Sequence, residues 1–300
     1  MVKPKRRWMK YDHYGYLFIA PFFLAYFLFH LYPMMYTIGL SFTDVKGMNQ
    51  DFQFVGFQNY TWLWGNEYFW YSMYNTAIMW IINFIPQLGF ALLFAAIFAS
   101  KHIKVRGKQF FKVIFYMPNI IMAASVALLF GTLFAHPFGT FTIIFKELGL
   151  VSESFQFLRD EWATRLLVCF IQFLIWTGPT TIMLAAGMTS VNNSLYESAM
   201  LDGATSRQMF FRITVPLIKP ILLYTLVTSL VGGLQVFDIP FLLNNGGPLN
   251  ATTTIAVYTY KLAFTGDNNF SGSAAGSVYL MLIAIACSFA LFKMMGAKNT

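Results

Sequence analysis

The side chains best suited to hold a polar ligand lie within long apolar segments of the chain. Gln172 and Trp176 are four residues apart, which places them on one face of a helix. In a later segment Gln235 and Asp238 are three residues apart, with Phe237 beside them. An aromatic ring can cover the C–H face of a sugar, while amides and carboxylates hydrogen-bond its hydroxyl groups. These five residues are therefore candidate contacts for a polyhydroxylated solute.

Each candidate also has a structural interpretation. Gln172 could equally form a hydrogen bond between helices, a common use of amides in membrane bundles, and the same holds for Asn75 and Asn83. Asp238 is the only acid inside an apolar segment, and such a position is a functional hypothesis by default. Because Asp238 lies near one end of its segment, beside Pro240, we favour a structural or gating role for it over ligand contact.

The sequence offers no set of residues for catalysis or metal binding. The two cysteines, Cys169 and Cys287, lie in apolar runs without the spacing of a metal site or a disulfide framework. The four histidines are scattered, and no nucleophile–base pair stands in a recognisable motif. The phosphate-binding pattern G-x-x-x-x-G-K-[ST] does not occur either. We therefore expect a protein that is not an enzyme and that holds no cofactor of its own.

The composition predicts a membrane protein. Apolar residues make up 57% of the 300 residues and charged residues 11%, against roughly 45–50% and about 25% in soluble proteins. Six apolar stretches are each long enough to cross about 30 Å of hydrocarbon as a tilted helix. We place them at residues 14–42, 73–100, 110–135, 163–189, 217–243 and 272–295. The expected fold is an all-α membrane protein of six transmembrane helices, several of them kinked by proline.

The distribution of Lys and Arg predicts the orientation. Fifteen of the 20 basic residues fall at 1–13, 101–112, 207–219 and 293–300. Basic loops stay on the cytoplasmic side, so both termini are expected inside the cell. The net charge of +8 is thus a sign of topology and not of nucleic-acid binding. The chain divides accordingly into an N-terminal segment, a transmembrane domain and a short tail, at 1–13, 14–295 and 296–300.

The outer connections at 43–72, 136–162 and 244–271 are too short for a separate soluble domain. A mixed apolar and charged stretch at 141–148 suggests a short surface helix. The run Asn245-Gly246-Gly247-Pro248 predicts a tight turn. This turn could fold the outer loop into a surface for a binding protein, or it could be a plain turn without a partner.

A compact elbow is predicted in the connection at 190–220. Ser194 is a suitable N-cap, and Glu197 three residues later completes a capping box. A helix then runs over 195–201 and ends before Gly203, because glycine accepts the left-handed geometry that terminates helices.

A second short helix follows the glycine corner. It starts at Ala204, or at Thr205 acting as a cap, and carries Phe210. Two short helices joined in this way form an elbow that could transmit force to another protein. The alternative is an ordinary amphipathic loop beneath the bundle, but the apolar residues Met200, Leu201 and Phe210 suggest burial against a partner or the bundle itself.

Nine residues of this elbow stand in a distinctive order and spacing: Glu197, Ser198, Ala199, Asp202, Gly203, Ala204, Phe211, Ile213 and Pro216. Together they resemble the signature loop of binding-protein-dependent ABC permeases, which reads E-A-A, three residues, G, and then I-x-x-x-P or I-x-x-P. Ser198 replaces the usual first alanine, a small-for-small change. In that family the loop is a coupling helix that docks in a cleft of the ATPase. The resemblance implies that Glu197 meets a basic group there and that Gly203 permits the turn.

The stretches at 232–238, 245–248 and 252–264 resemble the carbohydrate-uptake permeases. They are similar to the first-type subunit, the counterpart of the larger membrane subunit of the maltose transporter. This chain departs from that subunit in lacking extra N-terminal spans and a large outer domain. The resemblance implies that Gln172 and Trp176 stand where the maltose-type subunit contacts its sugar.

The resemblance as a whole implies a permease subunit of an ATP-driven sugar or oligosaccharide importer in the bacterial inner membrane. It would work by alternating access coupled through residues 190–216. The implied partners are a second permease subunit in a heterodimer, two ATPase subunits that hold ATP and Mg, and an extracytoplasmic solute-binding protein. Alternatives are a permease for another polar solute, such as a polyamine or glycerol phosphate, or an ATP-independent channel or membrane enzyme. The scarcity of charge in the spans favours a neutral solute.

Overall fold

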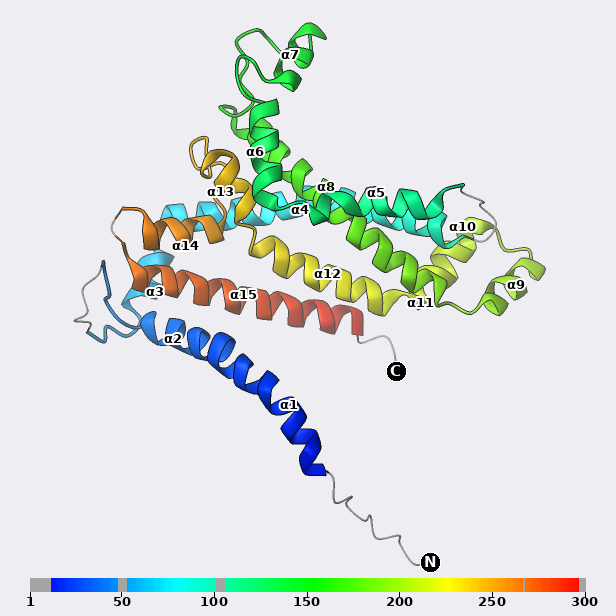
Figure 1. The fold of residues 1–300 in the computed structure, drawn as a ribbon, viewed down its shortest axis with the longest axis horizontal. Coiled ribbons are helices and arrows are strands. Elements are labelled where there is room, and N and C mark those ends of the chain that lie inside the picture. The colour runs from blue at the N-terminus through cyan, green and yellow to red at the C-terminus, as the bar shows by residue number, and fades with distance from the viewer. Residues whose placement is uncertain (1–11, 48–52, 101–105, 267, 297–300) are drawn as a thin grey trace, which may run out of the picture.

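The computed structural model describes residues 12–47, 53–100, 106–266 and 268–296, and the regular elements of these ranges are helices (Figure 1). The α-helices are α1 Asp12–Tyr26, α2 Tyr32–Leu40, α3 Gln58–Trp64, α4 Glu67–Ala99, α5 Lys108–Ile120, α6 Ala123–Leu133, α7 Thr140–Glu147, α8 Glu161–Thr189, α9 Asn193–Leu201, α10 Ser206–Met209, α11 Val215–Leu217, α12 Lys219–Leu234, α13 Asp238–Asn244, α14 Ile255–Phe264 and α15 Phe270–Gly296. Two π-helical turns, η1 Phe27–Leu31 and η2 Phe210–Thr214, complete the order. The all-helical prediction is confirmed.

Within the described residues, five helical segments are long and apolar enough to cross a membrane, or six if the bent pair α5–α6 counts as one. The five are Tyr14–Leu40, Glu67–Ala99, Glu161–Thr189, Lys219–Asn244 and Phe270–Met294. They overlap the predicted stretches.

The second segment begins six residues earlier than the predicted start at 73. Asn66 caps α4 by accepting hydrogen bonds from the backbone amides of Tyr68 and Phe69. Glu67 in the first turn favours the same end of the helix through its charge. These capping signals lie outside the apolar run, so the apolar pattern alone placed the start too late.

The third and fifth stretches, two of those expected to be kinked by proline, are broken helices. α5 and α6 meet at a bend of 90° because Ile121 and Met122 adopt extended backbone. α5 packs along α8, whereas α6 turns away and packs against α13 (Figure 1). The fifth stretch is interrupted between α12 and α13, where residues 235–237 leave the helix.

The two π-turns each precede a proline closely. Pro33 lies in the first turn of α2, two residues after η1 ends, and Pro216 lies two residues after η2 ends. Proline has no backbone N–H and its ring displaces the carbonyl four residues earlier, so the local hydrogen-bond pattern widens. At Pro33 and Pro216 the helix is therefore distorted by a local π-bulge that precedes the proline.

The pair α4–α8 forms the centre of the bundle. Small residues on both helices, Ala91, Ala95 and Ala185, are buried where the two pack together, and small side chains allow close approach of membrane helices. The long helix α12 packs against both members of this pair, and α15 packs along α12 (Figure 1). By contrast, the segment Tyr14–Leu40 has no buried residues in its most apolar window, so it diverges from the bundle as Figure 1 shows.

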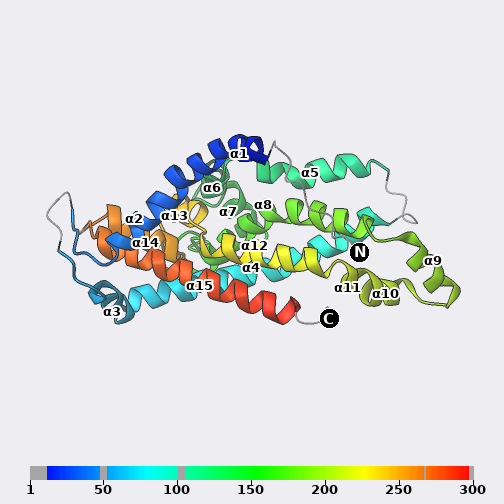
Figure 2. The ribbon, with the colours of Figure 1, turned by 90° about the horizontal axis from the view of Figure 1, so that it is seen from below.

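Two groups of connecting helices lie at opposite ends of the long axis, whereas α7 projects to one side of it (Figure 1). α9, α10 and α11 form one end, and α3 and α14 lie at the other (Figures 1 and 2). The surface helix suggested at 141–148 is confirmed as α7, while α3 and α14 were not expected in their loops. Residues 1–11 of the predicted N-terminal segment and 297–300 of the predicted tail lie outside the described residues.

Candidate functional site

The elbow after α8 is a pair of short helices with a glycine corner, as predicted. α9 ends in a Schellman motif, in which the Gly203 amide donates to the Met200 carbonyl at 3.1 Å and the Ala204 amide donates to the Ala199 carbonyl at 2.9 Å. This arrangement needs a left-handed residue after the helix, and Gly203 supplies it with φ +75°. Asp202 is the C-cap residue.

The caps of the elbow differ in part from the prediction. Asn192, and not Ser194, is the N-cap of α9: its side chain accepts a hydrogen bond from the Ser194 amide at 3.0 Å. The predicted capping box at Ser194 and Glu197 is therefore wrong, since both residues lie one or more positions inside the helix. The second helix does begin after Thr205, which forms a complete capping box with Gln208.

The elbow presents an exposed surface while remaining fixed to the bundle. Glu197, Ser198 and Asp202 are exposed, and the apolar side chain of Leu201 is 91% exposed. The remaining signature residues lie at the glycine corner and on the short helices beside it. Gly203, Phe211 and Pro216 are exposed, and Ala199, Ala204 and Ile213 are half-buried.

Two contacts anchor this elbow. The hydroxyls of Tyr196 on α9 and Thr214 on η2 are 2.8 Å apart and hydrogen-bonded. Phe210 packs against the buried cluster that joins α4, α8 and Ile218. A displacement of the elbow would therefore also displace residues that pack against α4 and α8. Of the three apolar residues considered, Met200 and Leu201 are exposed whereas Phe210 packs against the bundle, and docking against another protein stays a prediction.

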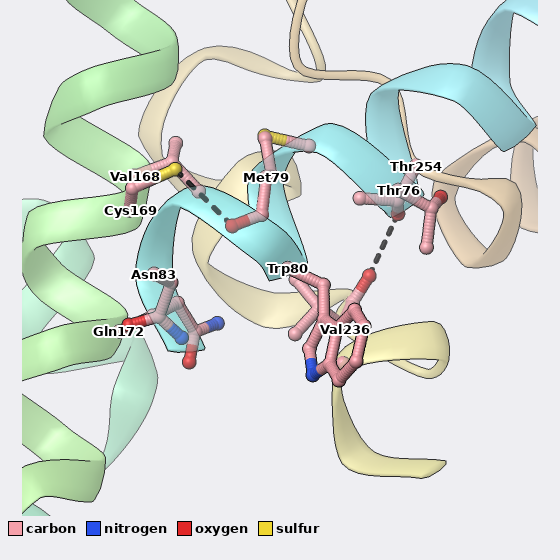
Figure 3. Close-up of a pocket in the computed structure, with 10 residues that line it drawn as sticks. Thr76, Met79, Trp80, Asn83, Val168, Cys169, Gln172, Val236 and Thr254 are labelled. Atoms are coloured by element: carbon pink, nitrogen blue, oxygen red, sulfur yellow. Dashed lines mark hydrogen bonds between the residues drawn. The ribbon is translucent and has the colours of Figure 1, made fainter. Parts of the chain in front are cut away.

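A small cavity lies between α4, α8 and the break that follows α12 (Figure 3). Its volume is about 20 Å³, and one water molecule needs roughly 10–15 Å³. The lining residues are Thr76, Met79, Trp80, Asn83, Val168, Cys169, Gln172, Gly233, Val236 and Thr254. None of them carries a formal charge, so the cavity suits a neutral polar group.

The amides of two helices face this cavity. Gln172 Oε1 accepts a hydrogen bond from the indole N–H of Trp176 at 3.1 Å, which confirms that the two share a helix face. The interhelical bond considered for Gln172 is made instead by Gln87, whose amide donates to Thr180 Oγ1 at 2.9 Å. Figure 3 shows the side-chain amides of Asn83 and Gln172 next to one another on one side of the cavity.

Trp80 and Gly233 form a close contact in the cavity wall. The indole N–H of Trp80 donates to Ser229 Oγ at 3.2 Å, and the ring stacks on Phe84. A methyl group at Gly233 would overlap the Trp80 ring, so α12 can approach α4 here only because residue 233 has no side chain. The aromatic wall was not identified from the sequence, although Thr76, Trp80 and Asn83 have the spacing of one helix face.

The other candidate ligand contacts lie outside this cavity. Trp176 is 48% exposed. Gln235 is the exposed C-cap residue of α12. Phe237 stacks on Phe241 with ring centroids 4.9 Å apart. Asp238 is exposed in the first turn of α13, where an acid stabilises a helix N-terminus.

Arg165 is a buried charge whose role the sequence did not reveal. Only 4% of it is exposed. Its Nε donates to the Ala251 carbonyl at 2.8 Å, and its Nη2 donates to Tyr71 Oη at 2.8 Å and Asn75 Oδ1 at 3.0 Å. This arginine lies within the predicted span at 163–189, and in the structure it joins α8, α4 and the 244–254 segment. An arginine four residues after an acid, Glu161, was the available signal.

The 244–254 segment connects this buried arginine to the cavity. Asn75 Nδ2 donates to the carbonyls of Asn250 and Thr253, at 2.8 and 3.2 Å, so Asn75 does act between elements as suggested. Thr254 Oγ1 then donates to the Val236 carbonyl at 2.7 Å, as drawn in Figure 3. Both Thr254 and Val236 line the cavity.

The predicted tight turn begins the same segment. Asn245 and Gly246 have φ of 46° and 75°, as the glycine-rich run requires. Lys261 of α14 donates to the Asn245 carbonyl at 2.6 Å, and burial lowers the pKa of Lys261 from its ordinary value. The turn is thus held to α14.

The sequence of this chain matches a known family over most of its length. The profile described as "Binding-protein-dependent transport system inner membrane component" matches residues 62–298. The chain belongs to this family. The membership predicted from the elbow is confirmed, and this permease is a transport component and not an enzyme.

Named relatives and a solved structure agree with this assignment. The permease is 31% identical over 284 residues to the lactose transport system permease protein LacF of Rhizobium radiobacter, with 94% of each chain covered. It is 29% identical to the arabinooligosaccharides transport system permease protein AraP of Bacillus subtilis, covering 92% of this chain and 87% of AraP. Its fold matches a chain of a bacterial alginate ABC transporter, solved in complex with an alginate pentasaccharide-bound periplasmic protein, with TM-score 0.81, 24% identity and 97% of each chain covered.

Proposed function

We propose that this permease carries a sugar or oligosaccharide across the bacterial inner membrane. The observation that carries the proposal is the uncharged cavity at the centre of the bundle, lined by two amides and an aromatic ring between α4, α8 and the break after α12. Amide groups hydrogen-bond hydroxyls, and aromatic faces cover C–H surfaces. Relatives named for lactose and arabinooligosaccharides support the same solute class.

The lining of the cavity argues against the charged alternatives. A polyamine would require carboxylates, and a glycerol phosphate would require basic groups. Neither occurs among the lining residues. Of the predicted contacts, Gln172 lines the cavity. Trp176 lies on the same face of α8 as Gln172 and is hydrogen-bonded to it. Gln235, Phe237 and Asp238 remain candidates for a solute in a more open state.

In the proposed mechanism the elbow couples transport to a separate ATPase. The signature residues form an exposed corner at one end of the molecule, and Phe210 ties that corner to the central helices. α1 begins and α15 ends toward the same end as the elbow (Figure 1), which supports six spans with both termini in the cytoplasm. ATP and Mg would bind to the two ATPase subunits, a second permease subunit would complete the pathway, and an extracytoplasmic binding protein would deliver solute.

The solute is tested by purification and reconstitution. The tagged permease is purified in mild detergent with its companion chains and placed in proteoliposomes. Uptake of radiolabelled lactose, arabinotriose, spermidine and glycerol 3-phosphate is measured with and without internal ATP. We expect ATP-dependent uptake of a sugar. Uptake of spermidine or glycerol 3-phosphate alone would contradict the proposed solute, and uptake without ATP would contradict the importer.

The coupling elbow is tested by Glu197→Lys. Because Glu197 is exposed, reversing its charge leaves the fold intact but repels a basic group on the ATPase. We expect normal membrane insertion with sugar uptake reduced at least about tenfold. Glu153→Lys, at a side chain that is 91% exposed, is the matched control and should transport normally. Equal uptake by both variants would rule out the role assigned to Glu197.

A further inference from the structure

Asn83 has a buried oxygen that lacks a hydrogen-bond partner. Its Oδ1 is one of two such side-chain atoms in the described residues; the other is Thr142 Oγ1. Leaving a buried acceptor unpaired is unfavourable, so an unpaired acceptor in a native protein needs an explanation, and a partner outside the chain is one.

The neighbouring amides of α4 show that Asn83 is an exception. Asn75 and Gln87 are both buried on the same helix, and each donates to an element across from it: Asn75 to the Asn250 carbonyl and Gln87 to Thr180. These two residues perform the interhelical role that was also considered for Asn83. Asn83 lies between them in the helix without such a bond from its oxygen.

The position of Asn83 indicates what its partner would be. The residue lines the central cavity, and its amide lies next to that of Gln172 (Figure 3). Thr76, Trp80 and Asn83 follow one another at spacings of four and three residues, so α4 turns one continuous face toward the cavity. The cavity has room for a single water or hydroxyl group and not for a sugar ring.

We propose that Asn83 is a solute-contact residue of α4 that selects for one hydroxyl group of the transported sugar. Its Oδ1 accepts the hydroxyl hydrogen, while Trp80 and Gln172 bound the same space. The cavity as it stands has room for one water molecule beside Asn83. When the cavity widens to admit the solute, the sugar hydroxyl occupies the position of that water. This inference rests on the proposed transport of a sugar.

A site built to hydrogen-bond a hydroxyl rejects an analogue without it, because the buried acceptor is then left unpaired. The test uses the complete importer in proteoliposomes, with the sugar of highest uptake and its monodeoxy analogues as radiolabelled substrates. The variants are Asn83→Leu and Asn83→Ala. The matched control is Ile85→Ala on α4, at a side chain that is 66% exposed.

The wild type is expected to discriminate at least about tenfold against one deoxy analogue. Asn83→Leu is expected to lower uptake of the parent sugar at least about tenfold and to leave uptake of that analogue unchanged, so the ratio falls to about one. Asn83→Ala should remove the same discrimination, and Ile85→Ala should retain it. The thermal midpoint of Asn83→Leu should equal or exceed that of the wild type, because an apolar isostere removes an unpaired group.

Two results would overturn the assignment. One is that Asn83→Leu shows the same ratio of parent-sugar uptake to deoxy-analogue uptake as the wild type. The other is an equal loss of uptake for every sugar together with a lower thermal midpoint, which is the behaviour of a purely structural residue. Either result leaves the proposed function standing, since sugar uptake by the wild type is measured in the same experiment. If the wild type carries no sugar at all, the proposed function itself fails.

Discussion

Arg165 illustrates how individual side chains organise the region around the cavity. Its guanidinium donates to three acceptors and lies over the Trp162 ring, with Cζ 5.0 Å from the ring centroid. Burial of an arginine is costly unless its donors are satisfied. Here the contacts fix the 244–254 segment, which reaches the cavity through Thr254. Arg165 is therefore a positioning residue that does not itself touch the cavity.

Replacing Arg165 with Met is expected to destabilise the permease by about 2–4 kcal/mol, because the Asn75 oxygen and the Ala251 carbonyl lose their donor. Arg159→Met, at an exposed arginine, is the control and should change stability by less than about 0.5 kcal/mol. Thermal unfolding of the detergent-purified proteins measures the difference. Equal midpoints for the two variants would show that the buried contacts contribute no net stability.

At the scale of elements, the elbow depends on one backbone conformation. The Schellman motif at the end of α9 turns the chain by means of a left-handed residue. α10 can then begin at Thr205 and η2 can place Phe210 against the central pair of helices. The direction of α9 relative to the bundle therefore depends on Gly203, although its side-chain position contacts nothing within 4 Å.

Gly203→Val is expected to cost about 1–2 kcal/mol, since a residue with a Cβ is strained at positive φ. Gly203→Asn should cost less, because asparagine tolerates this geometry. We expect the valine variant to retain less ATPase subunit on affinity purification and to lose solute-stimulated ATP hydrolysis, with asparagine intermediate. If valine and asparagine behave alike, the left-handed corner is not what sets the docking geometry.

At the scale of the whole molecule, the long axis separates the elbow from α3 (Figure 1). The elbow occupies one end and α3 the other (Figure 1). Between them the most apolar window of the first span is wholly unburied within the single chain. An apolar surface of this extent requires lipid or another subunit around it.

Cysteine labelling tests the orientation of this axis. In a Cys169→Ser, Cys287→Ser background, Leu201→Cys marks the elbow and Phe57→Cys marks the start of α3, both at exposed side chains. A membrane-impermeant maleimide should label Phe57→Cys in right-side-out vesicles and Leu201→Cys in inside-out vesicles only. Labelling of Leu201→Cys from the outside would reverse the predicted topology.

Much of this protein could be read from local sequence patterns. The apolar stretches gave the helical class and the approximate spans, because hydrocarbon permits few other structures. The order from Glu197 to Pro216 gave the family and the glycine corner, since a helix end and its left-handed residue are encoded within a few positions. The shared face of Gln172 and Trp176 likewise followed from a spacing of four.

Tertiary structure alone decided the features that depend on distant residues. The bend between α5 and α6 arises where α5 packs on α8 and α6 packs on α13. The local sequence around Pro118 does not distinguish a 90° bend from a helix that continues past a proline. Asn75, Asn83 and Gln87 have similar chemistry in sequence, yet two find partners across the bundle and Asn83 faces a cavity. Arg165 lies in a predicted span, and only the fold shows that acceptors from α4 and the 244–254 segment meet its guanidinium. A hydrogen bond between two elements forms only when both partners are brought close together. Which residues come close depends on how all the helices pack, and local sequence patterns do not contain this information.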